Sequence, residues 1–517
     1  MMNHFSNLRR HTALPKAVAV SLFLLIAAST IAATQPQKPA DLTARLDTAV
    51  RYYADDDLFT GAILVARGDT MLLNKAYGYA NREWRTPNTV DTKFRIGSLT
   101  KQFTAAAVLR LQEQGKLRVG DRLKQYLPDI PASWDEITLH QLLSHTSGIP
   151  NYTAVKRVWT DPITPADMIG FLRDKPLDFA PGSDYRYSNS NYYLLGAVVE
   201  KVSGEKYEQY LRENIFGPAG MNDSGFDHAL TVLDKRASGY NRQGPGDLEN
   251  AGYIDTSVAF SAGGLYSTTA DLFRWRKALF GGKVLSAASF QTMTTPVKHD
   301  YGYGIVIDQE QNHKRFSHSG AINGFDSFLA YYPDDDLTVV VLSNTKTQAT
   351  RMALLMAHVV HGDPVSLPNS VPIAESVLQK YVGEYGQTGK VQVSITLDKG
   401  RLLMRRGDLF EYLINESDTK FYNKADSIEL NFHTDNSGAV TDVVGVANGH
   451  EVKFPRRNAA DSKATGASSE PSLVELKNAE RLAPGEHGFQ IHQKAACDPT
   501  DSCWAGSHYD LAGFTQH

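Results

Sequence analysis

Residues 94–105 read FRIGSLTKQFTA and contain an S-x-x-K motif, in which Ser98 precedes Lys101 by three positions. Residues 100–115 are rich in alanine and leucine, carry apolar residues at helical spacing and end at a glycine, which predicts a helix. A spacing of i, i+3 places both side chains on one helical face, within hydrogen-bond reach. The helix N-terminus favours negative charge that develops near Ser98. The motif therefore predicts a nucleophilic serine with a lysine beside it.

A serine hydroxyl is a poor nucleophile until a neighbouring base accepts its proton. A lysine acts as that base only if burial or a nearby cation lowers its pKa. The motif has little specificity by itself, because the chain contains three further matches, at Ser203, Ser343 and Ser417. Motifs elsewhere in the chain must therefore support the assignment.

The second motif is YSN at 187–189, within the polar stretch YRYSNSNYY, which is typical of a loop that presents side chains to a cleft. A tyrosine at this position can relay a proton between the serine and a leaving group. Asn189 can orient the lysine and bind a substrate amide. The same Y-x-N pattern also occurs at Tyr79, where we predict an ordinary strand.

The third motif is HSG at 318–320, which opens a predicted strand. His318 can form a polar or charged wall of the site, and Gly320 lets a substrate approach the backbone closely. A single histidine on a strand is also consistent with a purely structural hydrogen-bonding role.

The motifs SLTK, YSN and HSG, in this order, resemble those of the serine β-lactamase and penicillin-binding-protein superfamily. The resemblance is to the branch that holds class C β-lactamases, D-Ala-D-Ala carboxypeptidases and esterases. Three connecting segments agree with it, and it covers roughly residues 42–350. These segments are LLSHTSGIPNY at 142–152, FGPAGMNDSGF at 216–226 and SAGGLYSTTADLFRW at 261–275.

The resemblance implies a role for each motif residue. Ser98 would be the nucleophile, Lys101 its activating base and Tyr187 the proton shuttle, with Asn189 supporting both Lys101 and the substrate. The backbone N–H groups of Ser98 and Ala321 would form the oxyanion hole, which is typically worth about 3–4 kcal/mol per donor. His318 and Gly320 would contact the substrate. This chemistry needs no cofactor.

The third motif departs from that of class C β-lactamases, which have Lys-Thr-Gly where this chain has His318-Ser319-Gly320. This form is more similar to the peptidase and esterase members. An unperturbed histidine is mostly neutral at pH 7, so it is a weaker anchor for a carboxylate than lysine.

We therefore predict a serine hydrolase that acts through an acyl-serine on small peptide (D-amino-acid-type), ester or cell-wall-derived substrates. One alternative is a β-lactamase or penicillin-binding protein with weak β-lactam turnover. Another is a non-catalytic protein that binds cell-wall material or peptides, against which the intact set of Ser98, Lys101 and Tyr187 argues.

The N-terminus predicts export. Three basic residues precede the twelve-residue apolar run AVAVSLFLLIAA at 17–28, which is too short to span a bilayer but suits a signal peptide. Small residues follow, with cleavage expected after Ala32 or Ala33. Residues 1–33 thus predict a signal peptide, a periplasmic or secreted protein, and no stable membrane anchor after cleavage. An uncleaved anchor is the alternative.

Strands at both ends with helices between them predict one α/β domain at 40–362: an antiparallel sheet flanked by helices, plus a helical region. Residues 373–456 alternate between apolar and polar positions in short runs, which predicts a small antiparallel β-barrel with an accessory role. A flexible linker is expected at 457–480.

The final segment, 481–517, resembles part of copper/zinc superoxide dismutase. His487, His492 and His508 match metal ligands of that family, but Gln490 replaces a copper-binding histidine. The chain ends before most of the zinc ligands. We expect a remnant without dismutase activity, in which His492 and His508 offer a degenerate copper or zinc site. A bifunctional hydrolase and metal protein is the alternative.

The composition excludes two broad classes. Lys and Arg number 53 against 57 Asp and Glu, giving a formal net charge of -4, which argues against a nucleic-acid partner. The only cysteines are Cys497 and Cys503, so neither a disulfide framework nor a four-cysteine zinc site holds the main body together.

Overall fold

The computed structural model describes residues 39–154, 160–346, 349–386, 392–447 and 450–457. The predicted signal peptide, the linker beyond residue 457 and the segment that contains His492 and His508 lie outside these residues. Within the described ranges, we find no helix that is both long and apolar enough to cross a membrane.

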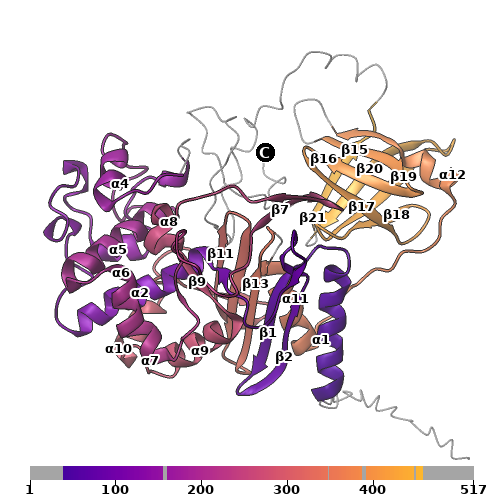
Figure 1. The fold of residues 1–517 in the computed structure, drawn as a ribbon. Coiled ribbons are helices and arrows are strands. Elements are labelled where there is room, and N and C mark those ends of the chain that lie inside the picture. The colour runs from indigo at the N-terminus through magenta and orange to yellow at the C-terminus, as the bar shows by residue number, and fades with distance from the viewer. Residues whose placement is uncertain (1–38, 155–159, 347–348, 387–391, 448–449, 458–517) are drawn as a thin grey trace, which may run out of the picture. The chain divides into compact units, whose positions relative to one another are not determined.

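Six strands form the central antiparallel sheet, in the order β10-β11-β12-β13-β1-β2 (Figure 1). Their bounds are β1 Gly61–Arg67, β2 Thr70–Tyr77, β10 Val306–Glu310, β11 His313–Ile322, β12 Phe325–Tyr332 and β13 Leu337–Ser343. The pairing of β1 with β13 runs from Gly61 opposite Ser343 to Arg67 opposite Leu337. The first and last strands of this domain therefore share a sheet.

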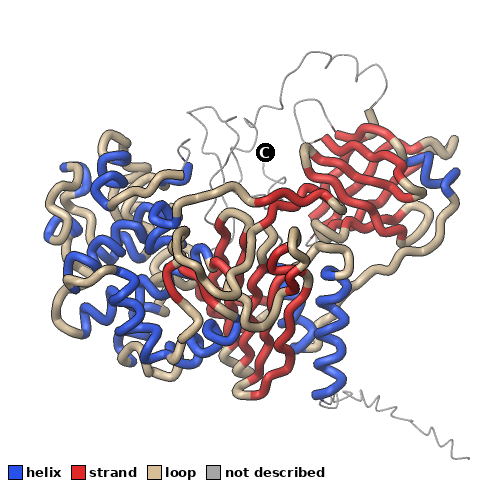
Figure 2. The backbone as a smooth tube through the Cα atoms, in the orientation of Figure 1, coloured by secondary structure: helices blue, strands red, loops and turns tan. Residues whose placement is uncertain are grey.

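Helices cover both faces of this sheet (Figure 2). Successive side chains of a strand point to opposite faces. In β1, Ala62 and Leu64 belong to the larger core, whereas Ile63 and Val65 belong to a second core under α1 (Pro39–Ala54) and α11 (Ala349–His361). Both faces of β1 are buried, which explains why its sequence is continuously apolar.

The helical region contributes the rest of the larger core. Its helices are α2 Thr100–Glu113, α3 Leu139–Leu143, α4 Pro165–Leu172, α5 Asn189–Ser203, α6 Tyr207–Leu211, α7 Gly217–Ala219, α8 Thr256–Gly263, α9 Thr269–Phe280 and α10 Ala287–Met293. Short strands complete the domain: β3 Tyr79–Asn81, β4 Thr86–Pro87, β5 Phe94–Arg95, β6 Gly225–Phe226, β7 Tyr240–Gly244, β8 Asp247–Asn250 and β9 Leu265–Ser267. The predicted α/β architecture is confirmed.

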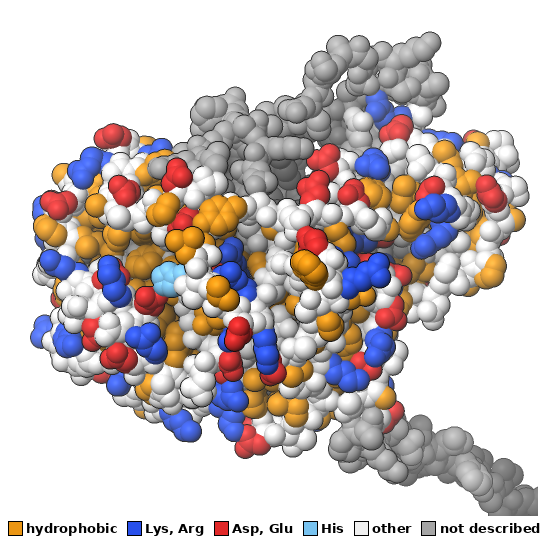
Figure 3. All heavy atoms as spheres, viewed as in Figure 1, with side chains coloured by type: hydrophobic (Ala, Val, Ile, Leu, Met, Phe, Trp, Pro, Cys, Tyr) orange, Lys and Arg blue, Asp and Glu red, His pale blue; other side chains and the backbone are white. Residues whose placement is uncertain are grey.

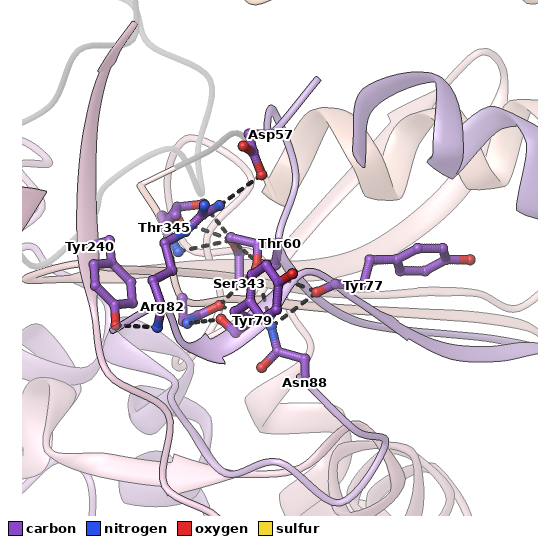
Figure 4. Close-up of polar contacts among 10 residues, drawn as sticks. Asp57, Thr60, Tyr77, Tyr79, Arg82, Asn88, Tyr240, Ser343 and Thr345 are labelled. Carbon is purple, nitrogen blue, oxygen red and sulfur yellow. Dashed lines mark hydrogen bonds and ion pairs between the residues drawn. The ribbon is translucent and has the colours of Figure 1, made fainter. Parts of the chain in front are cut away.

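Hydrogen bonds between buried polar groups connect the end of β13 to the start of β1 (Figure 4). Ser343 Oγ donates to the carbonyl of Thr60 at 2.7 Å, and Asn88 Nδ2 donates to the carbonyl of Tyr77 at 3.0 Å. Asn344 Oδ1 accepts from both Thr60 Oγ1 and Asn88 Nδ2. Buried polar groups are tolerated when they are paired in this way.

The C-terminal module is an eight-stranded antiparallel meander that follows a short helix, α12 (Glu375–Leu378). Its strands are β14 Gly383–Gly386, β15 Gln392–Asp398, β16 Arg401–Arg406, β17 Leu409–Asn415, β18 Lys420–Asn423, β19 Ile428–Thr434, β20 Val440–Ala447 and β21 His450–Pro455. An isolated bridge between Tyr385 and Arg456 brings its two ends together. The sheet is therefore nearly closed around its own apolar core, as the alternating sequence predicted.

On the face shown in Figure 3, acidic and basic side chains are interspersed. This distribution agrees with the nearly balanced charge of the chain.

Candidate active site

Ser98 lies in a tight turn, Gly97–Leu99, directly before α2, and is fully buried. Two glycines bring this turn against β11. Gly97 has φ +48, and a Cβ there would lie 2.7 Å from the backbone nitrogen of Ala321. A Cβ on Gly320 would lie 2.0 Å from the carbonyl oxygen of Ile96. The lack of a side chain at Gly320 thus lets the chain's own backbone approach. The sequence analysis expected it to let a substrate approach.

Lys101 is buried beside Ser98, and its Nζ has three hydrogen-bond partners. Its Nζ donates to Ser98 Oγ at 2.9 Å, to Asn189 Oδ1 at 2.7 Å and to the carbonyl of Ala262 at 2.8 Å. Burial lowers the pKa of Lys101 well below its ordinary value. A neutral lysine keeps a lone pair, so it can accept the proton of Ser98.

A kink in α8 accompanies the contact with Ala262. Phe260 adopts φ 38 and ψ -130 inside this helix, a conformation that non-glycine residues rarely adopt. The two carbonyls that follow face α2: Ser261 accepts from Thr104 Oγ1 at 2.7 Å, and Ala262 accepts from Lys101. Strained backbone of this kind typically occurs at functional sites. The sequence analysis assigned no role to these residues.

Tyr187 lies over the lysine, with Lys101 Nζ 4.8 Å from the centre of its ring. Burial raises the pKa of Tyr187 well above 10, and its hydrogen bond with Ser98 offsets this only in part. The phenol therefore keeps its proton at neutral pH. It is suited to donate or relay a proton, while Lys101 is the group suited to accept one.

Asn189 is the first residue of α5, whereas the sequence analysis placed the whole YSN motif in a loop. Its Oδ1 accepts from Lys101, and its backbone N–H donates to Asn151 Oδ1 at 3.2 Å. Its Nδ2 is buried and has no hydrogen-bond partner among the described residues. An unused buried donor of this kind fits the predicted contact with a substrate carbonyl.

His318 is fully buried in the middle of β11, not at the start of a strand. Its Nδ1 lies 2.5 Å from the carbonyl of Ser319, and its Nε2 lies 3.0 Å from the hydroxyl of Tyr301. A carbonyl can only accept, so Nδ1 carries the proton and Nε2 accepts from Tyr301 in the neutral ring. At the position of the lysine in the Lys-Thr-Gly motif, this site thus has a histidine whose two ring nitrogens both have hydrogen-bond partners.

His145 is a site residue that the sequence analysis missed. It has φ 57, and its ring centre lies 4.3 Å from that of Tyr187, 5.1 Å from that of Tyr192 and 4.9 Å from that of Tyr301. Its Nδ1 accepts from the backbone N–H of Ser188 at 3.2 Å. His145 belongs to the segment 142–152, so the resemblance pointed to this segment without giving the residue a role.

The other S-x-x-K matches have local structural roles. Ser203 Oγ donates to the carbonyl of Val199 at the end of α5, and Ser343 Oγ donates to that of Thr60. Ser417 Oγ accepts from the backbone N–H of Lys420 in an exposed turn. Ser98 is the match whose hydroxyl lies against a buried lysine.

The arrangement brings a serine hydroxyl, a buried lysine amine, a tyrosine hydroxyl and a helix N-terminus together in one place. Ser98, Lys101, Tyr187 and Asn189 are brought together as predicted, and Gly97 places the backbone of Ala321 beside them. Groups in this relation suit acyl transfer through a covalent serine ester.

Two family models match the chain. The model described as Beta-lactamase matches residues 46–361, and a domain of unknown function (DUF3471) matches residues 367–455. Both matches end before residue 481, so the likeness of the last segment to superoxide dismutase, with its metal site at His492 and His508, remains a prediction.

Known proteins resemble the chain over much of its length. A penicillin-binding protein of Bacillus subtilis (strain 168) is 30% identical over 420 residues, which are 75% of this chain and 93% of that protein. Among solved structures, a penicillin-binding protein from Bacillus halodurans is 30% identical, with a TM-score of 0.53 over 59% of this chain and 97% of that one. A D-stereospecific amidohydrolase from Streptomyces is 25% identical, with a TM-score of 0.53 over 62% and 98%.

These likenesses agree with the geometry around Ser98. Half of the chain or more matches a single family model, and the Bacillus subtilis relative is matched over nearly its whole length. The chain belongs to the β-lactamase and penicillin-binding-protein superfamily of serine hydrolases.

Proposed function

We propose that the protein is an exported hydrolase that cleaves peptides of the D-amino-acid type, or esters, through an acyl-serine at Ser98. The observation that carries the proposal is the buried contact of Lys101 Nζ with Ser98 Oγ at 2.9 Å. Export is inferred from the N-terminal sequence, in which basic residues precede a short apolar run.

In the acylation step, Ser98 Oγ attacks the substrate carbonyl and its proton passes to neutral Lys101. The backbone N–H groups of Ser98 and Ala321 stabilise the oxygen that becomes negative. The bond to the leaving group then breaks, and the leaving group departs with a proton relayed through Tyr187. Water attacks the resulting ester, the acid is released, and Ser98 Oγ regains its proton.

Two observations support peptides and esters over β-lactams. His318 occupies the position of the lysine in the Lys-Thr-Gly motif, and its neutral ring is already engaged with Tyr301 and Ser319. It therefore supplies no fixed cation for a substrate carboxylate, which favours neutral esters and amides over β-lactams. The similarity to a Streptomyces enzyme described as a D-stereospecific amidohydrolase supports substrates with D-amino acids.

Intact-mass spectrometry of the protein after incubation with a fluorophosphonate, a p-nitrophenyl ester or penicillin tests the mechanism. We expect one fluorophosphonate adduct per chain, located on Ser98 by peptide mapping. Ser98→Ala should abolish it, whereas Ser203→Ala, at a structural S-x-x-K match, should keep it. An adduct on any other serine would overturn the assignment.

Turnover of a D-alanyl dipeptide and of its L-isomer then tests the substrate class. Hydrolysis of the D-isomer alone supports the proposal. A long-lived penicilloyl adduct without peptide or ester turnover would instead indicate a penicillin-binding protein, and would contradict the substrate class while keeping Ser98 as nucleophile.

A further inference from the structure

A second cluster of chemically reactive side chains lies where β11 begins and α11 ends, outside the serine site. His313, His361 and Asp363 each offer one ligand atom, and these atoms lie within 4.8 Å of one another. His313 comes from the sheet, His361 is the last residue of the helix that covers it, and Asp363 follows two residues later (Figure 1).

Local backbone geometry brings the three residues together. Gln311 and Asn312 both have positive φ, in a two-residue turn that joins β10 to β11 and places His313 opposite Glu310. On the other side, α11 ends at His361, and Gly362 adopts φ +82. That left-handed residue turns the chain back, so that Asp363 lies beside the last helical turn.

A buried carboxylate oxygen without a hydrogen-bond partner points to a missing ligand at this place. The His361 side chain is only 4% exposed, and its Nε2 lies 3.5 Å from Asp335 Oδ2 without a hydrogen bond. Asp363 Oδ2 is also buried without a hydrogen-bond partner, and within the described ranges Asp363 forms no ion pair. A buried carboxylate oxygen in this state is costly unless an ion or water satisfies it.

The nearby cationic side chains are engaged with other carboxylates. Arg67 pairs with Asp335 at 3.1 Å, and Arg315 pairs with Asp308 and Glu310. In addition, the C-terminal end of α11 carries the negative end of the helix dipole, which favours a cation. These arginines therefore do not neutralise Asp363, and a positive ion bound beside it would be stabilised.

We propose that His313, His361 and Asp363 bind a divalent transition-metal ion of the Zn²⁺ class, which ties the β10–β11 hairpin to the end of α11. Two imidazoles and one carboxylate are ligands that suit Zn²⁺, and three protein ligands leave a position for water. Asp335 Oδ2 lies 3.5 Å from His361 Nε2, within reach to support that ring as an outer carboxylate.

Binding requires a small rearrangement that the site permits. Two ligands about 2.1 Å from one tetrahedral ion lie about 3.4 Å apart, so the cluster must contract. The rings of His313 and His361 are stacked at 3.8 Å with 15° between their planes, so their in-plane lone pairs lie in two nearly parallel planes and do not meet at one ion. One ring must tilt. His313 is free to do so, because it is partly exposed at the end of a hairpin.

Titration of the chelator-treated full chain with ZnCl₂, by calorimetry and by thermal unfolding, tests the proposal. We expect one ion per chain and a rise in Tm, because an ion that binds the folded state stabilises it. Asp363→Asn nearly preserves the shape of the side chain, so it should fold. It and His361→Ala should each weaken Zn²⁺ binding at least about tenfold and remove the rise in Tm.

Two controls separate this site from other histidines. A His492→Ala/His508→Ala double variant should keep the ion and the rise in Tm, and so should His433→Ala, at an exposed histidine that pairs with Asp442. The proposal is wrong if the wild-type chain binds no Zn²⁺, if Asp363→Asn binds it unchanged, or if the double variant loses it.

Discussion

The Nζ of Lys101 lies 2.9 Å from the Oγ of Ser98, and both side chains are fully buried. Burial disfavours the ammonium form, which lowers the pKa of Lys101 well below its ordinary value and so favours the neutral base. Asn189 Oδ1 and the carbonyl of Ala262 can accept the two N–H bonds of neutral Lys101, which leaves its lone pair for Ser98 Oγ.

This relationship predicts the pH dependence of the reaction. Because only neutral Lys101 accepts a proton, kcat/KM should rise with pH through the lowered pKa and become constant above it. Lys101→Arg keeps the charge but cannot act as a base, and should cost about 10²–10⁴-fold in kcat/KM. Lys124→Arg, at an exposed lysine, is the control and should leave the profile unchanged. Near-normal turnover of the Lys101 variant would mean that another group activates the serine.

Tyr187→Phe tests the proton relay. The variant keeps the ring that packs on His145 and Lys101 but loses the hydroxyl. We expect a loss of about 10²–10⁴-fold with a substrate whose leaving group needs a proton. The loss should be much smaller with a p-nitrophenyl ester, whose leaving group departs as an anion. Equal losses with both substrates would show that the hydroxyl does not protonate the leaving group.

Gly320→Ala tests the contact between β11 and the turn that holds Ser98. The added Cβ would meet the carbonyl oxygen of Ile96 at 2.0 Å, so the variant should lose about 3 kcal/mol or more in free energy of unfolding. Gly170→Ala is the matched control. Gly170 lies in α4 with open space around it, so alanine should be neutral or stabilise by up to about 1 kcal/mol. Denaturant unfolding measures both, and equal stability of the two variants would contradict the packing.

The effect of His318 on kcat/KM should depend on the charge of the substrate. Protonation of its ring requires the Tyr301 hydroxyl to stop donating to Nε2, and a substrate carboxylate can compensate for that change. We therefore expect kcat/KM for a peptide with a free carboxylate to gain on that for a neutral ester as the pH falls. A constant ratio would show that His318 has a structural role only.

The sequence by itself predicted the class of fold and, through the resemblance of its three motifs to a known superfamily, the residues of the candidate site. The S-x-x-K spacing placed Ser98 and Lys101 on one helical turn, because residues three apart on a helix are neighbours whatever surrounds them. Alternating and continuous apolar runs likewise predicted the C-terminal meander and the antiparallel sheet. These inferences hold because they depend on local periodicity, which the chain carries without reference to its tertiary contacts.

Only the tertiary structure decided what depends on segments that are distant in the chain. The burial that lowers the pKa of Lys101 comes from α5 and α8, which are about a hundred residues away or more. The position of His145 under Tyr187 and the role of Gly320 against Ile96 follow from packing that no local pattern encodes. The meeting of His313 with His361 and Asp363 is of the same kind. The physical reason is that desolvation and close approach depend on which surfaces meet, and that is fixed only when the whole core forms.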